Sequence, residues 1–224
     1  MCNTQPVYLH TSFHRLDGAF FWFSWWWDGE KMVKRKKLTL VDILVTVMIA
    51  TVFAVVYRLW SPISDLVGVF GLQLEQLIYG MWFIAGTLAA LIIRKPFIAL
   101  IAETAAASGE FIAGSPYGGI LLIYGIAQGI GMECAFALFR YKVFTIWTAM
   151  LGGVFASFAS LGLDFLYANI GQLSAWVLTL RIVFRTVGAI LITGVLAAKL
   201  VQALQKTGVL SDIQPNEHNG KPYS

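Results

Sequence analysis

The chain has 224 residues, of which 58% are hydrophobic and only 12% are charged. Typical soluble domains carry about 25% charged residues, and a soluble globule of this composition would expose large apolar patches to water. These numbers argue against a soluble enzyme, a disordered tail and a nucleic-acid-binding protein. They favour a protein that crosses the lipid bilayer several times.

Motifs for catalysis or metal binding do not occur in the sequence. All three histidines lie in the terminal tails, two cysteines are too few for a disulfide framework or a four-cysteine zinc site, and no P-loop is present. We therefore expect a protein that is not an enzyme, with no catalytic residues, no metal site and no cofactor of its own.

Six apolar segments are long enough, or nearly so, to cross about 30 Å of hydrocarbon as helices. They cover residues 38–57, 77–93, 97–113, 119–139, 143–163 and 176–200. Two basic turns, at 94–96 and 140–142, separate neighbouring segments, and Pro96 breaks the first of them. The pattern predicts an all-α membrane protein with six transmembrane helices.

The distribution of positive charge predicts an orientation. Eleven of the 16 Lys and Arg residues lie before the first span, in the two basic turns or at the end of the sixth span, whereas the loops at the other end hold only Arg58. Since positive loops stay in the cytoplasm, both termini are predicted to be cytoplasmic. The loops 58–76, 114–118 and 164–175 then face outward. The first is half apolar, and it is either a lid over the bundle or an ordinary interfacial loop.

Three parts of the chain differ in composition. Residues 1–37 are an N-terminal extension, 38–210 the six-helix membrane domain, and 211–224 a polar tail. The aromatic run at 20–27 is too short to span the bilayer and lacks the features of a signal peptide. It is either an interfacial anchor or lies upstream of the true start, for which Met32 is our preferred hypothesis.

Ionisable residues inside the spans are costly and usually mark function or a buried ion pair. We expect Asp42 to be solvated near the inner interface. Glu103 and Glu110 are two helical turns apart and share a face. The remaining intramembrane polar residues are Glu133, Asp164, Arg181, Arg185 and the uncharged Gln128.

Together with the orientation, these positions predict a cavity that opens outward and is edged by carboxylates and aromatic rings. Its candidate substrate-binding residues are Glu75, Tyr79, Trp82, Glu103, Glu110, Tyr117, Gln128 and Asp164. Such a cavity suits a small organic cation, because aromatic faces attract cations and a carboxylate adds a charge-assisted hydrogen bond. Alternatively, the acids pair with Arg181 and Arg185 to hold helices together, and the rings belong to an interfacial belt.

Small residues at a spacing of four permit close helix packing. Ala50 and Ala54 form such a pair in the first span, and Gly125 and Gly129 form another in the fourth. The contact surface could lie within the protein or against a partner.

Several ordered motifs carry a resemblance to a known family. They are QLIYGMWF at 76–83, IRKP at 93–96, Glu103 with Glu110, GSP at 114–116, QGIGME at 128–133 and FRYK at 139–142. Over about residues 36–210 the chain resembles the substrate-binding (S) components of energy-coupling-factor (ECF) vitamin transporters, most closely the YkoE family.

This resemblance implies an S-component-like bundle in the plasma membrane of a bacterial cell. The bundle would bind thiamine or its hydroxymethylpyrimidine precursor from outside. It also implies partners, namely an ECF transmembrane coupling subunit that meets Ala50 and Ala54, and ABC ATPase subunits that hydrolyse ATP. The alternative function is a proton-coupled secondary carrier for a small cationic or aromatic amine, with Glu103 or Glu133 as the proton relay.

Overall fold

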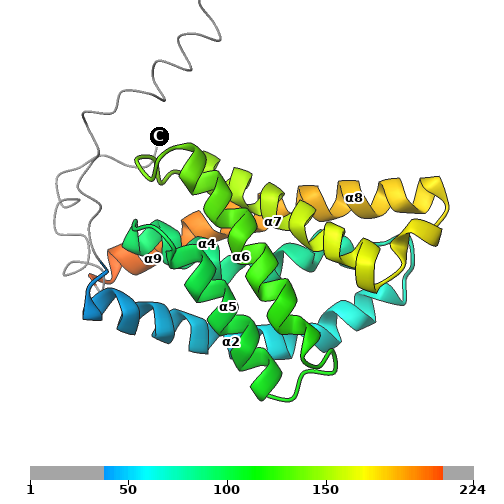
Figure 1. Cartoon of the computed structure of the whole chain (residues 1–224), viewed down its shortest axis with the longest axis horizontal. Helices are drawn as coiled ribbons and strands as arrows, with labels where there is room; N and C mark the ends of the chain where they lie inside the picture. The colour runs from blue at the N-terminus through cyan, green and yellow to red at the C-terminus, as the bar shows by residue number, and fades with distance from the viewer. Residues whose placement is uncertain (1–37, 209–224) are drawn as a thin grey trace, which may run out of the picture. The chain divides into compact units, whose positions relative to one another are not determined.

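The computed structural model describes residues 38–208, which form a bundle of helices joined by short connections (Figure 1). The predicted N-terminal extension, the Met32 start and the polar C-terminal tail lie outside these residues. The elements are α2 (Leu40–Gly68), α3 (Glu75–Ile78), the 3-10 helix η1 (Tyr79–Phe83), α4 (Ile84–Ile93), α5 (Ile98–Ile112), α6 (Ile120–Leu138), α7 (Ile146–Tyr167), the 3-10 helix η2 (Ile170–Gln172), α8 (Ala175–Ala189), the π-helical segment η3 (Ile190–Leu196) and α9 (Ala197–Lys206).

Five helical runs within residues 38–208 are long and apolar enough to cross a membrane: Leu40–Gly68, Glu75–Ile93, Ile120–Leu138, Ile146–Tyr167 and Ala175–Lys206. The remaining predicted span corresponds to α5, which has only 15 residues. At 1.5 Å per residue it is about 22 Å long, shorter than the hydrocarbon layer. The exposed side chains of α2 are largely apolar, as a lipid-facing surface requires.

Helix α5 packs against α2, α4 and α6. In Figure 1, α2 runs along the lower edge, α7 and α8 along the upper edge, and α5 and α6 cross between them. Small side chains make this close packing possible. Ala99, Ala102 and Ala106 of α5 are fully buried, and a Cβ added to Gly109 would lie 2.5 Å from the Cβ of Ala54.

The first helix is longer than predicted. It continues from Tyr57 to Gly68 through Pro62, so the predicted outward loop 58–76 is helical over its first half. A proline inside a helix removes one N–H donor, but α2 continues as one helix past Pro62, so this prediction was wrong about where the helix ends. The true connection to α3 is short and contains three consecutive residues of positive φ, Gly71, Leu72 and Gln73.

The start of α2 is fixed by a capping box and an ion pair. Thr39 and Asp42 exchange hydrogen bonds between side chain and backbone, which satisfies N–H groups that a helix start leaves open. The Asp42 carboxylate also pairs with Lys95 in the turn between α4 and α5. Asp42 is therefore buried, and the expectation that it is solvated was wrong.

Candidate substrate-binding cavity

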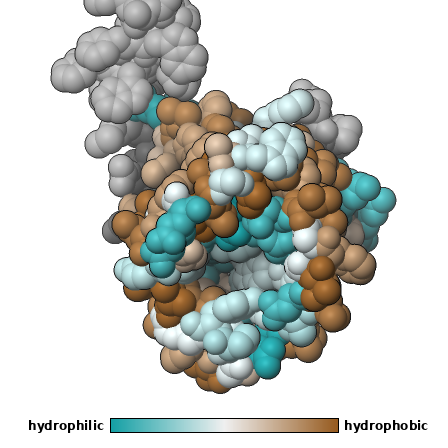
Figure 2. Space-filling view, turned by 90° about the vertical axis from the view of Figure 1, so that its right-hand side faces the viewer, coloured by the Kyte–Doolittle hydropathy of each residue, from teal (hydrophilic) through white to brown (hydrophobic). Residues whose placement is uncertain are grey.

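A cavity of about 600 Å³ opens at one end of the bundle. Its lining includes Gly71 from the α2–α3 connection, Tyr117 from the α5–α6 loop and Ala168 from the α7–α8 connection. Figure 2 shows the hollow from this end, with polar residues around it and apolar residues beyond them. Each of the three loops predicted to face outward thus contributes to its wall.

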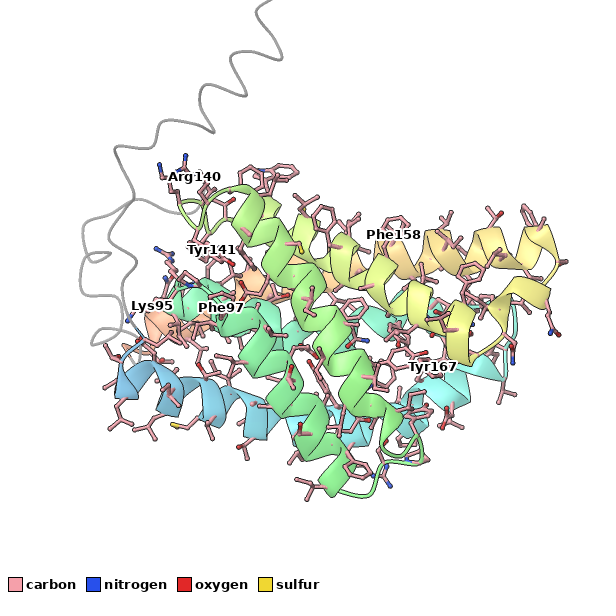
Figure 3. The ribbon with its side chains drawn as sticks, in the orientation of Figure 1. Lys95, Phe97, Arg140, Tyr141, Phe158 and Tyr167 are labelled. Atoms are coloured by element: carbon pink, nitrogen blue, oxygen red, sulfur yellow. The ribbon has the colours of Figure 1, made fainter. Side chains whose placement is uncertain are left out.

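The basic turns lie at the other end of the bundle. Lys95, Phe97, Arg140 and Tyr141 gather there, whereas Tyr167, which lines the cavity, lies near the opposite end (Figure 3). The separation matches the two ends that the charge pattern distinguishes.

All eight residues predicted to bind substrate line this cavity. They come from six segments: Glu75 from α3, Tyr79 and Trp82 from η1, Glu103 and Glu110 from α5, Tyr117 from the following loop, Gln128 from α6 and Asp164 from α7. The fold therefore brings together side chains that lie up to 89 positions apart in the sequence.

Glu103 is held on the α5 side of the cavity by hydrogen-bond donors rather than by an arginine. It is fully buried. Its carboxylate accepts hydrogen bonds from the Tyr57 hydroxyl at 3.1 Å and from the Gly86 amide at 2.9 Å. The Tyr57 hydroxyl in turn accepts a bond from the Ala85 amide at 3.0 Å. The α4 backbone and Tyr57 thus fix the position of Glu103.

Glu110 lies on the same face of α5 as Glu103 and is also fully buried. Its Oε1 accepts hydrogen bonds from Ser61 at 3.0 Å and Ser115 at 3.2 Å, whereas Oε2 accepts no hydrogen bond of good geometry from the described residues, although the Trp82 side chain lies next to the carboxylate. A buried polar atom without a partner is costly. Glu110 thus borders the cavity with one carboxylate oxygen that lacks a hydrogen bond.

The α8 side of the cavity carries a buried ionic cluster around Asp164. Oδ2 of Asp164 lies 2.9 Å from Arg181 Nη2 and 2.8 Å from Arg185 Nη2, and Oδ1 accepts a hydrogen bond from the Tyr124 hydroxyl at 2.7 Å. The predicted alternative of acids pairing with arginines therefore holds for Asp164, whereas the partners of Glu103 and Glu110 described above are hydroxyls and a backbone amide.

The aromatic residues of η1 form a cluster beneath this ionic group. The Tyr79 ring lies 5.2 Å from that of Trp82 and 5.5 Å from that of Phe83, and the Arg185 guanidinium sits 3.8 Å above the Tyr79 ring centre. A guanidinium over an aromatic face is an attractive contact. Trp82 is 8% exposed, so it lies inside the bundle and not in an interfacial belt.

Tyr117 lies at the mouth, in the loop outside the helices. Its hydroxyl donates a hydrogen bond to Asp65 Oδ1 at 3.2 Å. Burial of the phenol, together with the neighbouring Asp65 carboxylate, raises the pKa of Tyr117 to about 12. The bond joins the α5–α6 loop to α2 across the mouth.

Several lining residues were not among the eight predicted to bind substrate, for example Tyr57, Gln73, Gln76 and Tyr124. Tyr57, Ser61 and Ser64 follow one another at helical spacing and form a polar stripe on one face of α2. The sequence shows this stripe only if the first helix is taken to continue beyond Tyr57. Gln73 has no such signal, because its place depends on the backbone of the α2–α3 connection.

Other predicted residues lie elsewhere. Glu133 accepts hydrogen bonds from the Ala99 amide at 2.8 Å and from the Tyr141 hydroxyl at 2.8 Å, so it caps the start of α5. Ala50 and Ala54 are 3% and 7% exposed, on the side of α2 that meets α5. In this structure, that pair of small residues contributes to packing within the bundle.

Comparison with known proteins gives three similarities. A family model described as the ABC-type cobalt transport system, permease component, matches residues 41–159. A relative from Bacillus subtilis (strain 168), named “Putative HMP/thiamine permease protein YkoE”, is 36% identical over 171 residues, which cover 76% of this chain and 86% of the relative. A crystal structure of an S-component of an ECF transporter superposes with a TM-score of 0.76 at 34% identity, covering 79% of this chain and 90% of the other.

The helical fold and these similarities define a membrane-embedded transport subunit and not an enzyme. The chain belongs to the S components of ECF transporters, of the YkoE type, and is a multi-pass membrane protein.

Proposed function

We propose that this S component captures thiamine or its hydroxymethylpyrimidine precursor outside the cell and delivers it inward with ATP hydrolysed by partner subunits. The partners are an ECF transmembrane coupling subunit and ABC ATPase subunits. The protein then resides in the plasma membrane with both termini in the cytoplasm. The name of the Bacillus subtilis relative supports this class of ligand, and the positive charges at the end opposite the cavity support the orientation.

The carboxylate of Glu110 carries the proposal. Glu110 is fully buried, lines the cavity and leaves Oε2 without a hydrogen bond of good geometry from the described residues. Thiamine has a permanent positive charge on its thiazolium ring. A fixed cation beside the carboxylate balances its buried negative charge by direct electrostatic attraction, which neither water nor an apolar ligand does as well.

The aminopyrimidine ring has complementary features. It is flat and carries both donors and acceptors, and the same cavity offers the Trp82 ring and the Gln128 side-chain amide. We propose that these groups recognise the pyrimidine, which thiamine and hydroxymethylpyrimidine share. A ligand bound this way enters between the α2–α3 connection and the α5–α6 loop and is released inward when the partners reorient the bundle.

Titration of the purified protein by tryptophan fluorescence or calorimetry tests the binding step. Replacing Glu110 by Gln keeps the shape but removes the charge, and it should weaken thiamine binding by about 1–3 kcal/mol, roughly 5- to 150-fold. Hydroxymethylpyrimidine is neutral and serves as the matched control, since its affinity should change much less. Unchanged thiamine affinity in the variant would remove Glu110 from the site.

The energy-coupling step needs a separate experiment. Vesicles that contain this chain with the coupling and ATPase subunits should take up radiolabelled thiamine only when ATP is supplied. Full uptake by the chain alone, driven by a pH gradient, would contradict the proposal and establish the proton-coupled carrier in its place.

A further inference from the structure

The ionic cluster on the α8 side of the cavity carries more positive than negative charge. Arg181 and Arg185 both contact one oxygen of Asp164, and within residues 38–208 no other carboxylate lies within ion-pair distance of either guanidinium. Arginine does not lose its proton in proteins. One positive charge in this wall is therefore left without a described counter-charge, and charges away from water are costly unless they are paired.

The two arginines differ in what else they contact. Arg185 is fully buried, and its Nε donates to Gln76 at 2.7 Å, its Nη1 donates to Ser160 at 3.2 Å, and its plane lies over the Tyr79 ring. Its Nη2 forms the ion pair with Asp164 but has no hydrogen-bond partner among the described residues. Because the protein encloses the whole side chain, Arg185 has little capacity for a further ligand.

Arg181 has that capacity. Its Nη1 donates to Gln73 at 2.9 Å and its Nη2 to Asp164 at 2.9 Å, but its Nε is buried without a partner in the described part of the chain. The side chain is 17% exposed and lines the cavity. A planar guanidinium with an open N–H suits an oxyanion, and phosphate oxygens match its geometry.

This basic side is separate from the acidic one. Arg181 lies on α8, which packs against α3, η1 and α7, whereas Glu110 lies on α5, which packs against α2, α4 and α6. The cavity of about 600 Å³ lies within the range of roughly 300–1,000 Å³ usual for small-molecule sites. A ligand that carries a positive charge at one end and a negative charge at the other would balance the charges of both walls.

We propose that the Arg181 side of the cavity is an oxyanion subsite, through which this S component also captures the phosphate monoester of its cationic alcohol. The inference rests on the proposed function, because Glu110 holds the cationic part of the same ligand. The phosphate group then accepts a hydrogen bond from Arg181 Nε and supplies negative charge beside the Asp164 cluster. The free alcohol binds at the acidic side alone.

Parallel titrations with thiamine and thiamine monophosphate test the subsite. In the unmodified protein, the phosphate ester should bind at least as tightly as thiamine. Arg181→Gln should weaken binding of the ester by about tenfold or more, the loss of a charge-assisted hydrogen bond, and change thiamine affinity much less. Lys206→Gln removes the same charge from α9, at a residue that does not line the cavity, and serves as the control, which should alter neither affinity.

Each other outcome overturns the subsite in a recognisable way. If the unmodified protein binds thiamine but binds the ester more than tenfold more weakly, the subsite does not exist and the proposed function stands. Equal weakening of both ligands by Arg181→Gln means that Arg181 only supports the structure. If neither ligand binds the unmodified protein, thiamine capture fails together with the subsite, and titration with hydroxymethylpyrimidine decides whether the rest of the proposed function fails as well.

Discussion

A single methyl group at Gly188 should disturb both the packing of α8 and the binding cavity. Gly188 lies in α8 where this helix meets the end of α3. A Cβ at this position would lie 2.0 Å from the carbonyl oxygen of Leu77 and 2.6 Å from its carbonyl carbon, whereas ordinary van der Waals contacts begin at 3.4 Å. Because the obstacle is backbone, α8 and α3 must separate by more than about 1 Å.

The consequences extend to the cavity because Gln76 and Arg185 flank the contact. Their hydrogen bond is 2.7 Å long, so a separation of more than 1 Å breaks it. Overpacking costs about 1–3 kcal/mol, and loss of a hydrogen bond to a charged group costs about 1.5–3 kcal/mol. We therefore expect Gly188→Ala to lower the free energy of unfolding by about 3 kcal/mol or more and to weaken ligand binding.

Thermal unfolding in detergent and ligand titration measure these two effects. Gly162→Ala is the matched control, because Gly162 is in a helix and a Cβ there meets nothing within 4 Å. Relief of glycine's conformational entropy should leave the control as stable as the parent protein, or slightly more so. Equal stability and equal affinity of the two variants would refute the reasoning, since the close contact at Gly188 would then carry no cost.

Two further predictions concern tyrosines. Tyr57→Phe removes a donor from Glu103 and an acceptor from a buried backbone amide, so it should destabilise the protein by about 1–3 kcal/mol; an unchanged melting temperature would show that water replaces both bonds. Tyr117, with its pKa raised to about 12, should remain protonated at about pH 10, where an ordinary tyrosine is half ionised. Because its folded-state pKa is raised, its contribution to stability is present below about pH 10 and is lost as the pH rises towards 12. The tyrosinate absorbance of the parent protein minus that of Tyr117→Phe should therefore show no ionisation at pH 10, and a full step there would contradict the assignment.

Hydropathy predicted which segments are helical but not how long each helix is. The segment 97–113 is as apolar as a transmembrane span requires, yet its helix, α5, has 15 residues and lies among other helices. Much of its surface is buried against α2, α4 and α6, so packing as well as the bilayer thickness decides its length. The extension of α2 through Pro62 was not predicted because the local sequence, with a proline and polar residues, indicates a loop. Packing against the rest of the bundle overrides this local preference.

The candidate site could be predicted where it consists of ionisable residues, which are energetically costly inside a membrane span. Carboxylates in apolar segments are rare enough to stand out, and the four carboxylates among the eight predicted residues all line the cavity. What they contact was not predictable. The partner of Glu103 is Tyr57, 46 positions away, and the partners of Arg185 include Gln76, 109 positions away. Such pairings depend on which helices are neighbours, and a single sequence does not show that.

The positions where regular α-helix is interrupted explain why the cavity has this lining. The second membrane run changes to 3-10 helix at η1, which presents Tyr79 and Trp82 together, and the last run contains the π segment η3 just after Arg185. Close approach of the two interrupted helices needs glycine, because a Cβ on Gly80 would lie 2.8 Å from the Gly188 carbonyl oxygen. This approach places the Arg185 guanidinium on the Tyr79 ring. Arg185 is thereby enclosed by the protein, whereas Arg181, one turn earlier on the same helix, stays partly exposed in the cavity.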